Sequence, residues 1–189
     1  AGGRRGSAPG RGKLFMARWI DTGLARITRK GVRMTVLEER VDTPSTCHTE
    51  LVLATDGSGM RDGRAGFGYT GHMVVGGRRI GPDLEECGPV VIKPEQPEYI
   101  GARKATNNAG ELTAVYRALA RGAETLTQGA GIRVLADSLL AIHTTTGRWK
   151  AKKNKELVAR NRSAYAALKR RGVRVTFQHV KAHNGHAMN

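Results

Sequence analysis

The chain has 189 residues, a formal net charge of +16 and 39% hydrophobic residues. A chain of this length can bury about 70% of the surface that it exposes when unfolded, which suffices for one hydrophobic core. Its apolar runs are shorter than the roughly 18 residues that span a membrane, so no membrane partner is expected. Its two cysteines, Cys47 and Cys87, do not make a disulfide framework and favour a reducing, intracellular compartment.

The basic residues are concentrated in two blocks. Residues 1–33 contain nine Lys or Arg and one acidic residue. Residues 147–189 contain twelve Lys or Arg and one acidic residue. Two such blocks favour a nucleic acid partner over a basic surface that only aids solubility. Charge alone does not distinguish an RNA–DNA hybrid from structured RNA, or an enzyme from a ribosomal protein.

Residues 1–49 are predicted to form an extension ahead of the main domain. Residues 1–13 are rich in Gly and Arg and lack acids, which predicts a disordered basic tail. This start also resembles the end of an organellar transit peptide, so a mitochondrial or other organellar location stands beside a cytoplasmic or nuclear one. Residues 14–49 contain alternating segments around Arg29-Lys30-Gly31, which predict a small basic hairpin and a polar linker.

Residues 50–189 have the pattern of an α/β domain. Apolar segments predict strands over residues 51–54, 66–75, within 79–93, over 132–136 and over 173–180. Helical periodicity predicts helices over residues 108–121, 138–144 and 154–171, the last capped by Gly172. We expect Asp56-Gly57 to close the first strand in a turn. The order of elements indicates a mixed five-stranded sheet, its first three strands antiparallel, with helices on both faces.

Three short sequences each carry an acid at the end of a predicted element: TDGSG with Asp56, TNNAGEL with Glu111, and LADS with Asp137. Each acid has a local explanation, because Asp-Gly is a turn pair, Asn108 and Glu111 have the spacing of a capping pair, and Asp137 is placed to cap a helix. However, the predicted topology brings two strand ends and the first turn of a helix to one edge of the sheet. Carboxylates so close repel unless cations intervene, and hard oxygen ligands suit Mg²⁺ or Mn²⁺.

Together these sequences resemble a known family. TDGS, TNNxxE and ADS at these spacings, followed by VKxHxGH near the C-terminus, resemble the ordered motifs of type 1 ribonucleases H over about residues 50–189. The resemblance implies a ribonuclease H-like fold and a metal-dependent endonuclease that hydrolyses the RNA strand of RNA–DNA hybrids. It also implies two Mg²⁺ ions as cofactors, for which Mn²⁺ could substitute.

The resemblance also implies roles for matching residues. Asp56 would bridge the two metal ions, with Glu111 and Asp137 completing the ligands and Gly57 beside them. His183 matches a flexible histidine that moves protons or helps to release product. The residues assigned to nucleic acid contacts are Ser58, Thr106, Asn107, Asn108, Lys181 and Asn189. Among these, Thr106 matches a DNA-phosphate contact, and the asparagines match minor-groove contacts.

The segment between the second and third predicted helices is compact and basic. Many relatives carry a long basic handle here, but only sixteen residues separate Asp137 from Asn154. Trp149 in this segment either stacks on a sugar or base or covers the core. Its lysines are expected to contact phosphates: Lys150, Lys152 and Lys153.

Relatives also carry a further Asp shortly beyond the asparagine that matches Asn189, the last residue here. We expect a domain truncated at its C-terminus rather than a protein that lacks this acid and a C-terminal helix. As it stands, the 189-residue chain is expected to bind metal more weakly than such relatives and to cleave poorly.

Other functions stay open at this stage. A ribonuclease H fold can act as a nucleic-acid-binding or structural subunit, for example of an organellar ribosome, with the basic N-terminus contacting a large ribonucleoprotein. An integrase- or resolvase-like nuclease is disfavoured by the TNNxxE and HxGH motifs. A zinc site is disfavoured because neither cysteine has a CxxC partner; its ligands would be His179, His183 and His186 with Cys47 or Cys87.

Overall fold

The computed structural model of the chain describes residues 48–60 and 62–181. The predictions for the basic tail, the N-terminal hairpin, Cys47, His183, His186 and Asn189 lie outside these residues. The proposed domain boundaries stay predictions for the same reason.

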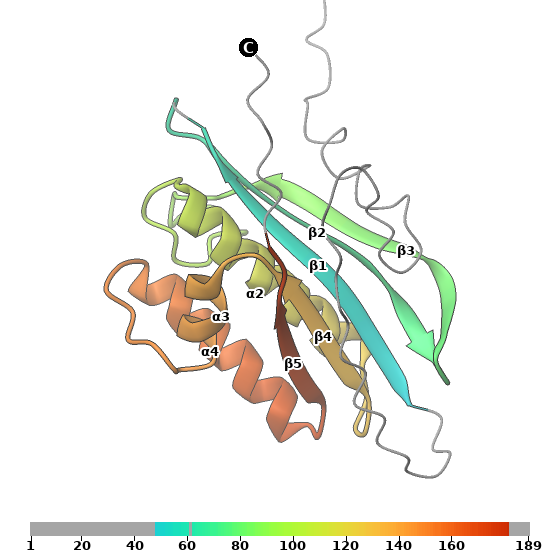
Figure 1. Cartoon of the computed structure of the whole chain (residues 1–189). Coiled ribbons are helices and arrows are strands. Elements are labelled where there is room, and N and C mark those ends of the chain that lie inside the picture. The colour runs from blue at the N-terminus through green and yellow to red at the C-terminus, as the bar shows by residue number, and fades with distance from the viewer. Residues whose placement is uncertain (1–47, 61, 182–189) are drawn as a thin grey trace, which may run out of the picture. The chain divides into compact units, whose positions relative to one another are not determined.

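The domain is built on one five-stranded mixed sheet (Figure 1). Its strands are β1 (Thr49–Gly59), β2 (Ala65–Val75), β3 (Arg78–Pro89), β4 (Gly131–Ala136) and β5 (Arg174–His179), in the spatial order β3-β2-β1-β4-β5. The first three strands are antiparallel neighbours, whereas β4 and β5 run parallel to β1. The predicted ribonuclease H-like sheet is therefore confirmed.

The first strand is longer than the sequence predicts. Asp56-Gly57 does not form a turn, because both residues lie inside β1, where Asp56 pairs with Gly68 and Gly57 with Phe67. The pairing with β2 continues without interruption to Gly59. Long-range strand pairing thus overrides the local turn preference of an Asp-Gly pair.

The third strand accommodates the Gly81-Pro82 pair as an irregularity. The register with β2 shifts here, since Gly71 pairs with Leu84 but Met73 pairs with Ile80. Pro82 has no N–H to donate, and it is tolerated because β3 is an edge strand.

The described helices follow β3 and alternate with the last two strands: α2 (Asn107–Thr125) precedes β4, and α3 (Leu139–Thr145) and α4 (Lys155–Arg170) lie between β4 and β5. Gly172 follows the end of α4 with φ +74°, the left-handed conformation that the sequence predicts there. None of the helices in the described part of the chain is long and apolar enough to cross a membrane.

The described helices lie together on one side of the sheet (Figure 1). This face carries Leu53, its neighbour Val134 on β4, and Phe177 on β5. The ring of Phe177 contacts the ring of Tyr165 on α4 at a centroid distance of 6.0 Å. The expected helical cover of the opposite face is not found within residues 48–60 and 62–181.

A contact between glycines sets the distance between β1 and α2. A Cβ atom on Gly57 would lie 2.0 Å from the backbone nitrogen of Glu111, and one on Gly110 would lie 2.4 Å from the carbonyl oxygen of Gly66. Strand and helix therefore touch through backbone atoms, closer than any side chain would permit.

We predict that Gly110→Ala lowers the free energy of unfolding by about 1–3 kcal/mol, the range for an overpacked interior. Gly122→Ala in the same helix is the matched control, because its Cβ would meet the flexible end of Ile132 rather than backbone. In the control, the gain in helix propensity of about 1 kcal/mol offsets the cost of moving the Ile132 side chain away from the new Cβ atom. Denaturant unfolding measures both variants, and equal effects would contradict this view of the contact.

Candidate active site

The three acids of the sequence motifs come together at the carboxyl edge of β4. Thr55 on β1 pairs with Ala136, the last residue of β4, so Asp56 within β1 and Asp137 directly after β4 lie at the same level on neighbouring parallel strands. The Thr55 hydroxyl donates to the carbonyl oxygen of Leu135 at 3.2 Å and ties the two strands together at this point.

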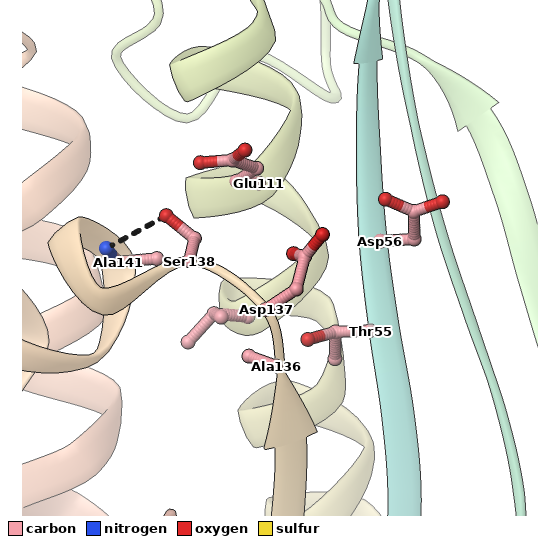
Figure 2. Close-up of a pocket in the computed structure, with 8 residues that line it drawn as sticks. Thr55, Asp56, Glu111, Ala136, Asp137, Ser138 and Ala141 are labelled. Atoms are coloured by element: carbon pink, nitrogen blue, oxygen red, sulfur yellow. Dashed lines mark hydrogen bonds between the residues drawn. The ribbon is translucent and has the colours of Figure 1, made fainter. Parts of the chain in front are cut away.

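Glu111 reaches the same edge from α2, which packs on β1 through the glycine contact. The sequence suggests that Glu111 lies in the first turn of this helix. The helix begins at Asn107, however, so Glu111 lies one turn further in. Figure 2 shows the Asp137 carboxylate between Glu111 on α2 and Asp56 on β1. The acids share one shallow depression, lined by Thr55, Asp56, Glu111, Val115, Ala136, Asp137, Ser138 and Ala141.

The local explanations for two of the acids do not hold. Thr106, not Asn108, caps α2, because its hydroxyl oxygen accepts from the backbone N–H of Ala109 at 3.2 Å. Ser138, not Asp137, caps α3 by accepting from the N–H of Ala141 at 3.2 Å. Asp137 and Glu111 are therefore free of the capping roles that would explain them structurally.

Burial and mutual repulsion make this edge unfavourable for negative charge. Burial raises the pKa of Asp56, the nearby Asp137 raises it further, and the hydrogen bond from the Gly57 N–H opposes both. Burial likewise raises the pKa of Glu111, which the nearby Ser138 side chain lowers and Asp137 and Asp56 raise by repulsion. No ion pair within the described residues neutralises any of the three acids.

The Glu111 carboxylate has one side-chain hydrogen-bond partner among the described residues, because the Asn107 amide nitrogen donates to its Oε1 atom at 2.7 Å. Ser138 lies close enough to lower the pKa of Glu111, and it was not among the predicted site residues. The available signal was a hydroxyl directly after Asp137 at a strand-to-helix junction.

The structure places most predicted nucleic-acid-binding residues around this edge. Thr106, Asn107 and Asn108 form the start of α2. Lys181 follows β5 and is exposed. It is held beside the site because the backbone N–H of Val180 donates to the carbonyl oxygen of Ala136 at 3.0 Å. Ser58 is exposed on β1, two residues beyond Asp56.

The segment after α3 holds Trp149 in a fixed and exposed position. Its side chain is 47% exposed, so it does not cover the core. Its ring contacts the ring of His143 at a centroid distance of 4.5 Å, with the two ring planes tilted by 47°. The Arg162 guanidinium donates to the carbonyl oxygens of Thr144 and Trp149, each at 2.8 Å. The predicted phosphate-contacting lysines of this segment are all exposed: Lys150, Lys152 and Lys153.

The zinc alternative is wrong for Cys87. Cys87 lies on β3 and His179 ends β5, at opposite edges of the sheet. Four strand spacings of about 4.8 Å separate them by roughly 19 Å. Within residues 48–60 and 62–181, no group of three or more His, Cys, Asp or Glu side chains lies close enough to hold a metal ion, the three acids of this edge included.

The family model for RNase H matches residues 48–189. The chain is also similar to solved structures. RNase H1 from Halobacterium salinarum is 21% identical, with 70% of this chain and 86% of that chain covered and a TM-score of 0.49. The N-terminal RNase H domain of rv2228c from Mycobacterium tuberculosis is 21% identical, with 72% and 85% covered and a TM-score of 0.50. No curated protein sequence matches the chain.

The fold and the site thus define an α/β protein of the ribonuclease H class. The chain belongs to the RNase H family, which makes it a ribonuclease H-type endoribonuclease at the level of the family. The structural similarities, at this identity, support the fold alone.

The raised pKa of Asp56 predicts a stability gain from Asp56→Asn in metal-free buffer. Folding favours the protonated form of Asp56. Its contribution to the free energy of unfolding is therefore fully present at pH values below the ordinary pKa of 3.8, and it is lost as the pH rises through the raised pKa. At pH 7 the Asn side chain replaces the ionised carboxylate of Asp56, so we expect Tm to rise.

Thermal unfolding in EDTA at pH 7 and at pH 3.5 measures this effect, and the gain should shrink at the lower pH. An equal gain at both pH values, or a loss at pH 7, would count against a destabilising Asp56 carboxylate.

Proposed function

We propose that this chain is a metal-dependent endonuclease that hydrolyses the RNA strand of RNA–DNA hybrids, using two Mg²⁺ ions or Mn²⁺. The observation that carries the proposal is the edge where Asp56, Glu111 and Asp137 line one depression without a neutralising cation from the described residues. Membership of the RNase H family supports the same reaction.

The donor set fits hard divalent cations. All three acids offer carboxylate oxygens, and no sulfur or imidazole nitrogen lines the depression. Such oxygen ligands suit Mg²⁺ and Mn²⁺ rather than zinc. Cations bound here would offset the repulsion that raises the pKa values of Asp56 and Glu111.

Each acid is positioned by a different feature of the fold. Asp56 lies on β1, the central strand of the sheet. Its carboxylate accepts from the Gly57 N–H at 2.8 Å, which orients it. Asp137 follows the last residue of β4, and Glu111 is held on α2 by Asn107. When bound, the two ions would activate the attacking water and stabilise the leaving oxygen of the phosphodiester. The protein's own contribution is to hold the three ligands at one edge.

The surroundings of the site suit a nucleic acid. The Thr106 hydroxyl accepts from Ala109 in the cap and keeps its proton to donate to a phosphate. The exposed lysines beyond α3 supply electrostatic attraction, and the fixed, exposed Trp149 ring offers a surface for a sugar or base. The segment with Trp149 and the lysines follows α3, whose seven residues span about 10 Å. It therefore starts only about 10 Å beyond Ser138.

We predict that Asp56→Asn abolishes Mg²⁺-dependent cleavage of a labelled RNA–DNA hybrid while leaving hybrid binding largely intact. Asp83→Asn is the matched control, since it makes the same change on the edge strand β3, in an ion pair with Arg79. Cleavage rates and hybrid affinity are measured for both variants with Mg²⁺ and with EDTA. Undiminished cleavage by Asp56→Asn would reject the assignment.

The same assay separates the enzyme from a nucleic-acid-binding or structural subunit of a ribonucleoprotein. A subunit of that kind would bind the hybrid or structured RNA and leave it uncleaved in both buffers. Metal-dependent cleavage by the unmodified chain, lost in Asp56→Asn, supports the enzyme.

A further inference from the structure

Two neighbouring asparagines begin α2 but differ in what they contact. Asn107 is the first residue of the helix and lies one turn before Glu111, the spacing at which side chains meet on a helix surface. Its amide nitrogen donates to Glu111 Oε1 at 2.7 Å. Asn108 is also exposed, and it has no side-chain hydrogen bond within the described part of the chain.

The contact from Asn107 restrains the most flexible of the three acids. Asp56 and Asp137 have short side chains on or directly after strands, and Asp56 is also fixed by the Gly57 N–H. Glu111 has one more rotatable bond and projects from a helix, so its carboxylate can adopt several rotamers. The hydrogen bond from Asn107 selects one position.

We propose that Asn107 is a positioning residue that holds the Glu111 carboxylate in place to bind a divalent cation, an inference that rests on the proposed function. This role differs from the minor-groove contact implied by the resemblance. The amide of Asn107 has a second N–H and an oxygen that Glu111 does not use, so one side chain can orient the ligand and still face the nucleic acid.

The expected effect is a loss of metal affinity. Partners that orient metal-ligating carboxylates typically change affinity by about 10–100-fold when they are removed. Because Asn107 is exposed, we expect the lower end of the range, about tenfold.

Calorimetric titration of Mn²⁺ into the full, metal-free chain tests the proposal. Asn107→Ala should bind Mn²⁺ about tenfold more weakly than the unmodified chain. Asn108→Ala is the matched control, and its Mn²⁺ affinity should not change. Adding Asn107→Ala to Glu111→Gln should cause no further loss, because the carboxylate that Asn107 orients is then absent. Metal-free thermal unfolding confirms that each variant folds.

Unchanged Mn²⁺ affinity in Asn107→Ala, with or without a higher KM for the hybrid, would overturn the proposal. An equal loss in Asn108→Ala, or a further loss in the double variant, would overturn it as well. If Asp56→Asn and Glu111→Gln bind Mn²⁺ as the unmodified chain does, the proposed function itself fails. If those two variants lose affinity and Asn107→Ala does not, only the role of Asn107 fails.

Discussion

The close packing of β1 on α2 is the constraint on which the site depends. Gly57 meets the backbone of Gly110 and Glu111, and a Cβ atom at Gly59 would lie 2.6 Å from the backbone nitrogen of Asn107. Because no side chain separates the two elements, the start of the helix lies directly against the strand that carries Asp56. A helix displaced by the width of one methyl group would carry Glu111 away from the other acids.

This arrangement conflicts with what stability alone would favour. A partly buried edge with three acids raises the pKa values of Asp56 and Glu111, and no described basic residue pairs with them. The rest of the domain follows ordinary rules, with buried aliphatic residues between the sheet and the helices and capped helix starts. Violations of such rules concentrate at functional sites, where a ligand compensates for the strain.

The sequence predicts the fold and the three acids well because both depend on short-range patterns. Apolar alternation, helical periodicity and Gly172 locate the elements to within a few residues. The errors arise where distant segments decide the outcome. Asp56-Gly57 continues as strand because β2 pairs with it, and Thr106 rather than Asn108 caps the helix because α2 starts one residue earlier than predicted. The hydrogen bond from Asn107 to Glu111 lies within α2 at a spacing of four residues, which the sequence does encode. The nearness of Ser138 to Glu111 depends instead on how α3 packs beside α2, which no local pattern encodes.

The central claim is that separated stretches of the chain bring three carboxylates together to bind divalent cations. A crystal structure of the unmodified chain grown with Mn²⁺, with the ions located by anomalous scattering, tests it most directly. We expect manganese between Asp56, Glu111 and Asp137, at oxygen distances of about 2.0–2.3 Å. Manganese bound elsewhere, or these carboxylates paired with basic side chains instead, would contradict it.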